Sequence, residues 1–152
     1  MIDLALYQPE IPQNTGTILR MGACLGVPIH LIEPASFTLS DKALRRAGLD
    51  YLDKAALVRH ANWEAFEAWR MAEGRRLILL STRSDGTHTG FRFEPGDVLL
   101  AGRETSGVPD PVRDAADFSI RIPMAPGTRS LNVAVAAAMV LGEALRQTGG
   151  FG

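Results

Sequence analysis

The sequence predicts an α/β protein with a mostly parallel sheet and helices on both faces. Short runs that are apolar throughout alternate along the chain with segments of helical periodicity. Strands of this kind are typical of parallel sheets that are covered on both sides. The 152 residues contain no repeat, low-complexity tract or long linker, so we expect a single domain spanning residues 1–152.

Each expected element follows from a local pattern. Apolar runs predict strands over residues 2–7, 28–32, 76–81, 98–101 and 118–122. Capping residues and periodicity predict helices over residues 12–26 and 40–48, after Asn62, and over residues 131–145 behind an N-cap at Ser130. We interpret the aromatic stripe within residues 63–69 as core or interface rather than as a platform for stacking bases.

The segment of residues 120–132 combines a rigid loop with polar side chains at the start of a helix. Pro123 and Pro126 fix φ at about −65°, and Gly127 permits backbone geometry closed to other residues. The helix behind Ser130 is apolar on every face, which is typical of burial in a core or against a second subunit. Taken alone, the segment is equally compatible with an ordinary core helix and with a binding site.

Composition and charge narrow the function classes. The chain has 16 Lys and Arg against 17 Asp and Glu, which argues against a general nucleic-acid coating protein but leaves room for a local basic patch. We interpret the basic pairs at residues 45–46, 59–60 and 75–76 as solvated ends of elements. Cys24 is expected to pack inertly in the core. We expect no metal site, since three scattered histidines form no cluster, and no signal peptide or membrane span.

Loops after the strands are the expected place for a ligand, because open α/β sheets bind ligands beyond the carboxyl ends of their strands. Three such loops follow Leu80, Ala101 and Ile122. No Gly-x-Gly-x-x-Gly motif follows a strand, and residues 102–107 lack the Lys-Ser/Thr of a P-loop. A Rossmann dinucleotide site and an NTPase site are therefore disfavoured.

Three motifs occur in order along the chain. Residues 10–20 place Asn14 and Arg20 on an expected helix, residues 102–109 read Gly-Arg-Glu-Thr-Ser-Gly-Val-Pro, and residues 120–132 end in Ser-Leu-Asn. The set resembles the SPOUT superfamily of S-adenosylmethionine-dependent RNA methyltransferases, which carries a Gly-x-Glu-x-x-Gly-x-Pro loop and a Ser-x-Asn start to the last helix. The resemblance covers essentially the whole chain, with Val108 as a small departure from a common leucine.

Residues 7–16 and 44–51 resemble one branch of that superfamily, the minimal branch without an added RNA-binding domain. That branch methylates the ribose 2′-hydroxyl of the wobble nucleotide of tRNA, a cytidine or uridine at position 34. The resemblance implies S-adenosylmethionine as cofactor, a cytoplasmic location and a homodimer formed through the C-terminal helix. It also implies a C-terminal trefoil knot, a topology that general rules treat as nearly absent.

The resemblance also assigns roles residue by residue. The residues that it implies for catalysis are Arg20, Asn14, Ser130 and Asn132. The implied cofactor-binding residues are Leu80, Gly102, Ile122, Ser130 and Leu131, and the implied RNA contacts are Arg20, Arg45, Arg46 and Arg129. Because a guanidinium has a pKa above ~12 and is a poor base, we interpret Arg20 as a clamp that orients phosphate and hydroxyl. Glu104 is either a base or a tie for its own loop.

Other functions stay open at this point. The chain could methylate another position of tRNA or rRNA, which the same motifs allow. A non-catalytic RNA-binding module would bind tRNA without binding the cofactor. A metabolic nucleotide-binding enzyme would methylate a small molecule and ignore tRNA, and the weak net charge favours it slightly.

Overall fold

The six strands form one parallel sheet in the order β3-β2-β1-β5-β4-β6, in a computed structural model that describes residues 1–38, 40–48, 54 and 56–151. All strand pairings of this sheet among the described residues are parallel, as expected. The strands are β1 (Asp3–Tyr7), β2 (Ile29–Ile32), β3 (Leu57–His60), β4 (Leu77–Leu80), β5 (Val98–Ala101) and β6 (Phe118–Ile120).

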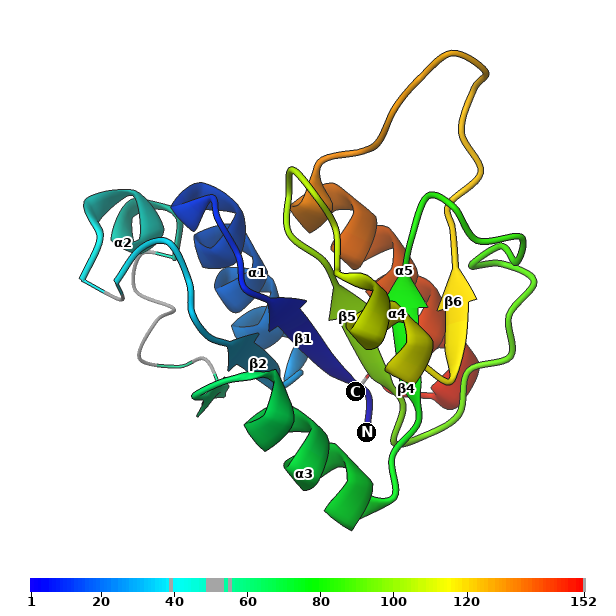
Figure 1. Ribbon diagram of the computed structural model, residues 1–152, viewed down its shortest axis with the longest axis horizontal. Helices are drawn as coiled ribbons and strands as arrows, with labels where there is room; N and C mark the ends of the chain where they lie inside the picture. The colour runs from blue at the N-terminus through cyan, green and yellow to red at the C-terminus, as the bar shows by residue number, and fades with distance from the viewer. Residues whose placement is uncertain (39, 49–53, 55, 152) are drawn as a thin grey trace.

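Helices cover both faces of this sheet (Figure 1). They are α1 (Pro12–Leu25), α2 (Lys42–Gly48), α3 (Trp63–Glu73), α4 (Asp110–Ala115) and α5 (Val133–Thr148). One core lies between the sheet and α1 and α5, where Leu4 and Leu6 of β1 meet Leu19 and Val140. A second core lies between the sheet and α3 and α4, and there Phe66 is fully buried. The aromatic stripe of α3 is therefore core, as expected.

The last helix begins later than the sequence predicts. It starts at Val133, and its N-cap is Asn132, whose Oδ1 accepts hydrogen bonds from Ala134 N at 2.8 Å and Val135 N at 3.3 Å. The expectation of an N-cap at Ser130 was wrong, because Ser and Asn are about equally good caps and only the tertiary structure decides which one is used. Ser130 lies in the preceding loop and is exposed.

Two elements were not predicted. β3 is an edge strand with a mixed burial pattern, so its sequence shows no continuous apolar run. α4 is a single short helix with Pro111 in its first turn, and from the sequence this segment was expected only to connect two strands. Both are elements whose formation depends on packing against neighbours rather than on local pattern.

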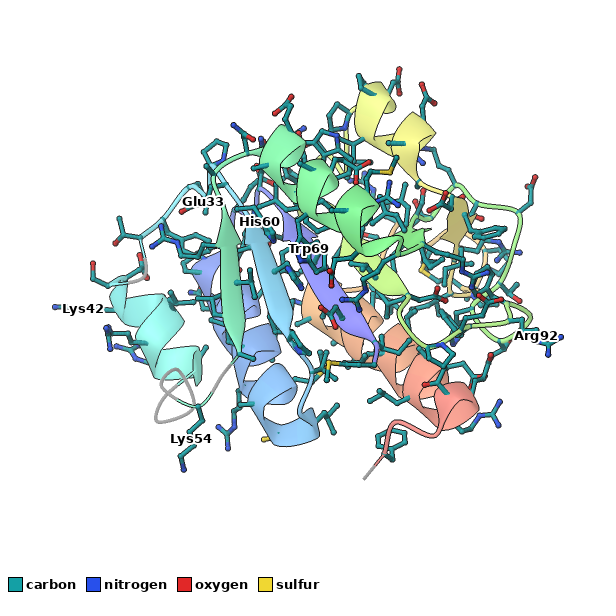
Figure 2. All side chains as sticks on the ribbon, turned by 90° about the horizontal axis from the view of Figure 1, so that it is seen from below. Glu33, Lys42, Lys54, His60, Trp69 and Arg92 are labelled. Carbon is teal, nitrogen blue, oxygen red and sulfur yellow. The ribbon has the colours of Figure 1, made fainter. Side chains whose placement is uncertain are left out.

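Two expectations about single residues were also wrong. Cys24 is exposed on α1 rather than packed in the core. The histidines are not all scattered, because β2 and β3 bring His30 Nδ1 within 2.9 Å of His60 Nε2, while His30 Nε2 lies 2.7 Å from Asp3 Oδ2. Figure 2 shows His60 near Trp69 of α3, and their ring centroids are 5.6 Å apart. No group of three potential metal ligands occurs among the described residues.

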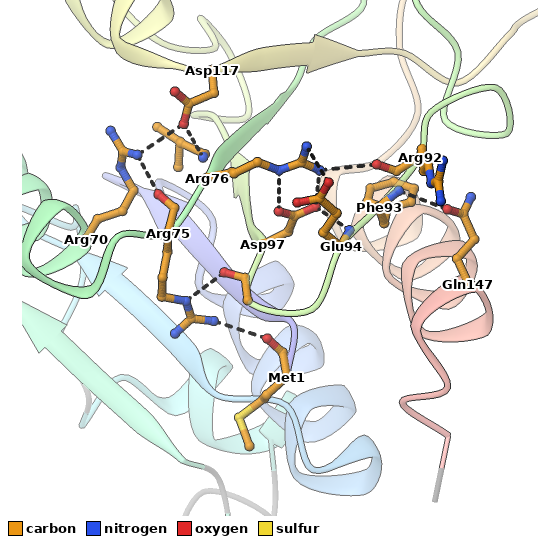
Figure 3. Close-up of polar contacts among 12 residues, drawn as sticks. Met1, Arg70, Arg75, Arg76, Arg92, Phe93, Glu94, Asp97, Asp117 and Gln147 are labelled. Atoms are coloured by element: carbon orange, nitrogen blue, oxygen red, sulfur yellow. Dashed lines mark hydrogen bonds and ion pairs between the residues drawn. The ribbon is translucent and has the colours of Figure 1, made fainter.

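The basic pair at residues 75–76 is not a solvated end but a clamp on the amino ends of the strands (Figure 3). Arg76 Nε donates to Asp97 Oδ1 at 2.7 Å, and Arg75 Nη1 donates to Asp3 Oδ2 at 3.0 Å. Their partners lie 21 and 72 residues away, so no local pattern in the sequence indicates the pairing. His60 of the pair at residues 59–60 is also buried, whereas Arg45 and Arg46 are exposed as expected.

Within the described part of the chain, none of the helices has the length and apolar character that crossing a membrane requires. Residues 49–51 of the segment 44–51, on which part of the family resemblance rests, lie outside the described residues.

Candidate functional site

A cavity of about 700 Å³ opens at the carboxyl ends of β4, β5 and β6, beside the start of α5. This is the edge at which parallel α/β sheets bind ligands. Two of the implied catalytic residues that line it, Asn14 and Asn132, come from α1 and from the cap of α5. All of the implied cofactor-binding residues line it too, namely Leu80, Gly102, Ile122, Ser130 and Leu131.

Backbone proximity makes glycine necessary at Gly102. A Cβ added there would lie 2.8 Å from both Cα and the carbonyl carbon of Gly107. The loop between them closes on itself, since Arg103 N donates to Gly107 O at 2.9 Å and Gly107 N donates to Arg103 O at 3.0 Å. Gly107 has a φ of +64°, a conformation that glycine adopts without strain. The loop is therefore a tight hairpin that forms one wall of the cavity.

Two glutamates join this hairpin to the start of α1. Glu104 Oε2 accepts from Glu10 N at 2.8 Å, and Glu10 Oε1 accepts from Thr105 N at 3.1 Å and from Thr105 Oγ1 at 2.8 Å. The hydrogen bonds from Thr105 hold the pKa of the Glu10 carboxyl below its usual range. In this structure the Glu104 side chain ties its hairpin to the segment before α1 rather than only to its own loop.

Asn132 connects the cap of α5 to the side chain of Asn14. Its Oδ1 caps the helix, and its Nδ2 donates to Asn14 Oδ1 at 3.0 Å. Asn14 is buried, with 9% of its surface exposed. The amide dipoles of both side chains are therefore fixed in direction at this wall of the cavity.

The four arginines implied to contact RNA lie elsewhere. Arg20, Arg45, Arg46 and Arg129, all of them described, are exposed, and none lines the cavity. Arg20 is six residues along α1 from Asn14, which is about 9 Å of helix. The structure therefore brings Asn14, Ser130 and Asn132 to the cavity and leaves these arginines on the surrounding surface.

Four other arginines line the cavity without having been singled out from the sequence. They are Arg83, Arg103, Arg113 and Arg121. Arg113 lies on α4 and its Nη1 donates to Ser81 Oγ at 3.0 Å. Among the described residues that line the cavity, Glu104 is the one with an acidic side chain, and it already accepts a hydrogen bond from Glu10 N. The walls therefore carry an excess of positive charge. Arg103 and Arg121 lie within the motifs of residues 102–109 and 120–132, whereas Arg83 and Arg113 lie outside the three motifs, so only the fold could have identified those two.

The fold and the cavity define a parallel α/β protein with a candidate ligand site at the carboxyl edge of the sheet. A sequence profile of the SpoU rRNA Methylase family matches residues 1–142. The chain belongs to this family.

Curated relatives align over nearly the full length of the chain. A protein of Beijerinckia indica named "tRNA (cytidine(34)-2'-O)-methyltransferase" is 61% identical over 146 residues, which are 96% of this chain and 91% of the relative. A protein of Escherichia coli K12 with the same name is 44% identical over 151 residues, covering 98% of this chain and 95% of the relative.

Solved structures share the fold. A structure described as "Structural insights into the 2-OH methylation of C/U34 on tRNA" has a TM-score of 0.92 and 44% identity, and the match covers 97% of this chain and 95% of that one. An AdoMet-bound rRNA methyltransferase from Sinorhizobium meliloti has a TM-score of 0.88 and 28% identity, covering 95% of this chain and 56% of that one.

Proposed function

We propose that this chain transfers a methyl group from S-adenosylmethionine to the ribose 2′-hydroxyl of nucleotide 34 of tRNA. The observation that carries the proposal is structural. The residues implied for cofactor binding line one cavity, next to the hydrogen-bonded pair of Asn14 and Asn132. The names of relatives at 61% and 44% identity support the position and the acceptor atom.

The cavity suits the proposed cofactor. Leu79, Ala101 and Val140 give it apolar walls of the kind that receive an adenine ring, and Ser130 and Arg113 add polar groups for the rest of the molecule. Arg113 Nε is buried and has no acceptor among the described residues, so a donor is left for a ligand to satisfy. The bound cofactor would supply a methyl group on a sulfonium, and no metal is needed for that chemistry.

The proposed role of the protein groups is positioning. Holding two reactants in line contributes several kcal/mol to such a transfer. We assign Asn14, Ser130 and Asn132 to the polar wall beside the reacting atoms. Arg20 lies outside the cavity lining, which suits a clamp on the RNA backbone, while Arg45, Arg46 and Arg129 are assigned to further phosphates.

The proposal includes a single methyltransferase domain with a C-terminal trefoil knot. Its support is that the loop of residues 81–97 is bonded to the chain before and within α5. Arg121 N donates to Gly86 O at 2.8 Å, and Gln147 Nε2 donates to Phe91 O at 2.9 Å. The segment between these bonds contains the long loop and the helix that Figure 1 draws in orange and red.

The proposal also includes a homodimer through α5 and a cytoplasmic enzyme. The dimer is supported by an apolar stripe at the start of α5, formed by Leu131, Val135 and Met139, which are 39 to 49% exposed. Val135 and Met139 are spaced by four and lie on one face of α5, and Leu131 lies directly before the N-cap of that helix. The cytoplasm is the compartment that contains the tRNA substrate.

The test is to incubate the protein with total tRNA and cofactor labelled in the methyl group, then to map the label by nuclease digestion and mass spectrometry. We expect a 2′-O-methyl group at nucleotide 34. A label at another position would assign the chain to another branch of its family. Binding of tRNA without any calorimetric signal for S-adenosylmethionine would instead support a non-catalytic module.

A further inference from the structure

The corner of the cavity formed by Ser81 and Arg113 has a distinct chemistry. Arg113 reaches it from α4, and its Nη1 donates to Ser81 Oγ at 3.0 Å. Its Nε is buried and has no acceptor, and no carboxylate of the described residues lies within ion-pair distance of it. A guanidinium held in this way retains donors for a planar anion that accepts two hydrogen bonds.

This corner is separated from the asparagine pair by the width of two strands. Ser81 directly follows β4, whereas Asn14 lies on the helix after β1, and β5 stands between these strands in the sheet. Neighbouring strands are about 4.8 Å apart, so the strands that lead to the two ends of the cavity are roughly 10 Å apart. A ligand that fills the cavity must therefore place different groups at its two ends.

The charges that line the cavity decide which group of the cofactor lies at which end. A sulfonium is repelled by arginines, and four arginines line the cavity, mainly away from the asparagine pair along β4, α4 and β6. The amide oxygens of Asn14 and Asn132 carry no positive charge, so the sulfonium is best accommodated near them. The α-carboxylate is the anionic group of the same molecule, and only this group gains by facing an arginine.

We propose that Arg113 is a cofactor-binding residue, with its guanidinium, fixed by Ser81, holding the α-carboxylate of S-adenosylmethionine at the β4 corner of the cavity. A small rotation of the Arg113 side chain turns the edge of the guanidinium that carries Nε toward the ligand. This inference rests on the proposed function, since it takes the cofactor from there.

The other arginines of the cavity are less suited to this role. Arg103 has its guanidinium 5.3 Å from the centroid of the Tyr7 ring, and its Nε is directed at Gly107 O at 3.4 Å. Arg83 is exposed in the loop after β4. Arg121 is the remaining competitor, because it follows β6 and is half-buried, and it is therefore included in the test.

The experiment compares two ligands that differ only in the carboxylate, S-adenosylmethionine and decarboxylated S-adenosylmethionine, by calorimetric titration without tRNA. In the parent protein we expect the carboxylate to tighten binding by about tenfold or more. Arg113→Met removes this difference by weakening S-adenosylmethionine alone. Arg113→Lys, which keeps the charge but not the planar fork, retains part of it, and Ser81→Ala weakens it in the same direction.

Arg92→Met is the matched control, because Arg92 is exposed outside the cavity and its change leaves both affinities as in the parent. The ratio of the two dissociation constants within one protein sample does not depend on the folded fraction. The assignment would be overturned if Arg113→Met lowered the affinity for both ligands equally or did not lower it at all. It would also be overturned if Arg121→Met, instead of Arg113→Met, lowered the affinity for S-adenosylmethionine alone. Failure of the parent protein to bind S-adenosylmethionine would overturn the proposed function itself.

Discussion

Single residues in this protein have more than one task, and Asn132 is the clearest case. One of its amide atoms caps α5 and the other orients Asn14. Gly102 is a second case, since it directly follows β5 and permits the close approach of Gly107. Substitutions at such positions separate structural from functional roles only if they change one atom at a time.

Asn132→Asp makes that separation. The carboxylate still caps α5, and a negative charge at a helix N-terminus is favourable, so we expect the thermal midpoint to stay near that of the parent. The donor to Asn14 is lost and two oxygens face each other, so we expect kcat to fall by about tenfold or more. Asn132→Ala, the control, also loses the cap and about 1 kcal/mol of stability. Full methylation activity in Asn132→Asp would show that the bond to Asn14 is dispensable.

Gly102→Ala is expected to abolish cofactor binding. The added methyl group would collide with the backbone of Gly107, and backbone atoms cannot move aside without opening the hairpin. Gly86→Ala is the control, because its Cβ would meet Ser119 O at an ordinary 3.6 Å. Calorimetry with S-adenosylhomocysteine checks both variants. Parental affinity in Gly102→Ala would mean that the hairpin does not shape the pocket.

Among the secondary-structure elements, the edge strand β3 contains a histidine, His60, whose titration makes stability depend on pH. Burial, and then the neighbouring His30, lower the pKa of His60 on β3. A histidine with a lowered pKa binds fewer protons in the folded than in the unfolded state, so stability is lost as pH falls below about 6.5.

The free energy of unfolding of the parent should therefore decrease between neutral pH and pH about 5.5. In His60→Gln this acid-side slope becomes smaller, because glutamine does not titrate. Urea unfolding at a series of pH values measures the slope, and the NMR titration of the His60 ring reports its pKa directly. A ring pKa at or above about 6.5 would contradict the prediction.

Met139→Asp on α5 tests the proposed homodimer and is expected to leave the protein monomeric. A charge placed in the apolar stripe would be buried without a partner if the stripe forms the interface. Met71→Asp on α3 is a matched control, since Met71 is also an exposed helical methionine, at 69%, and lies outside the stripe. Sedimentation at several concentrations distinguishes them. An identical response of both variants would place the interface elsewhere.

At the scale of the whole molecule, positive and negative side chains nearly balance. The net charge of −1 gives no general attraction for RNA, so binding must depend on local arginines. We expect Arg45→Gln and Arg46→Gln each to reduce the slope of log K for tRNA against log salt by about one, because each removes one of the proposed phosphate contacts. Arg92→Gln, also exposed, should leave the slope unchanged. Filter binding over a range of salt concentrations measures it.

Much of the fold could be predicted because the central strands are buried on both faces, so β1, β4 and β5 are apolar at nearly every position. The edge strand β3 could not be predicted, because half of it faces solvent and its pattern is mixed. The residues that the motifs assigned to cofactor binding all line the cavity, whereas Arg103 and Arg121, which lie within the same motifs, were not singled out. Arg113 was not singled out either, since its environment is created by Ser81, which is 32 residues earlier in the chain.

The hydrogen bond between Asn14 and Asn132 joins residues 118 positions apart. One part of this wall of the cavity thus comes from the first fifth of the chain, and the other part comes from the N-cap of the last helix. During synthesis, a nascent chain that has not yet released α5 from the ribosome has no closed cavity. The proposed affinity for the cofactor therefore depends on α5 and its cap, which complete this end of the cavity.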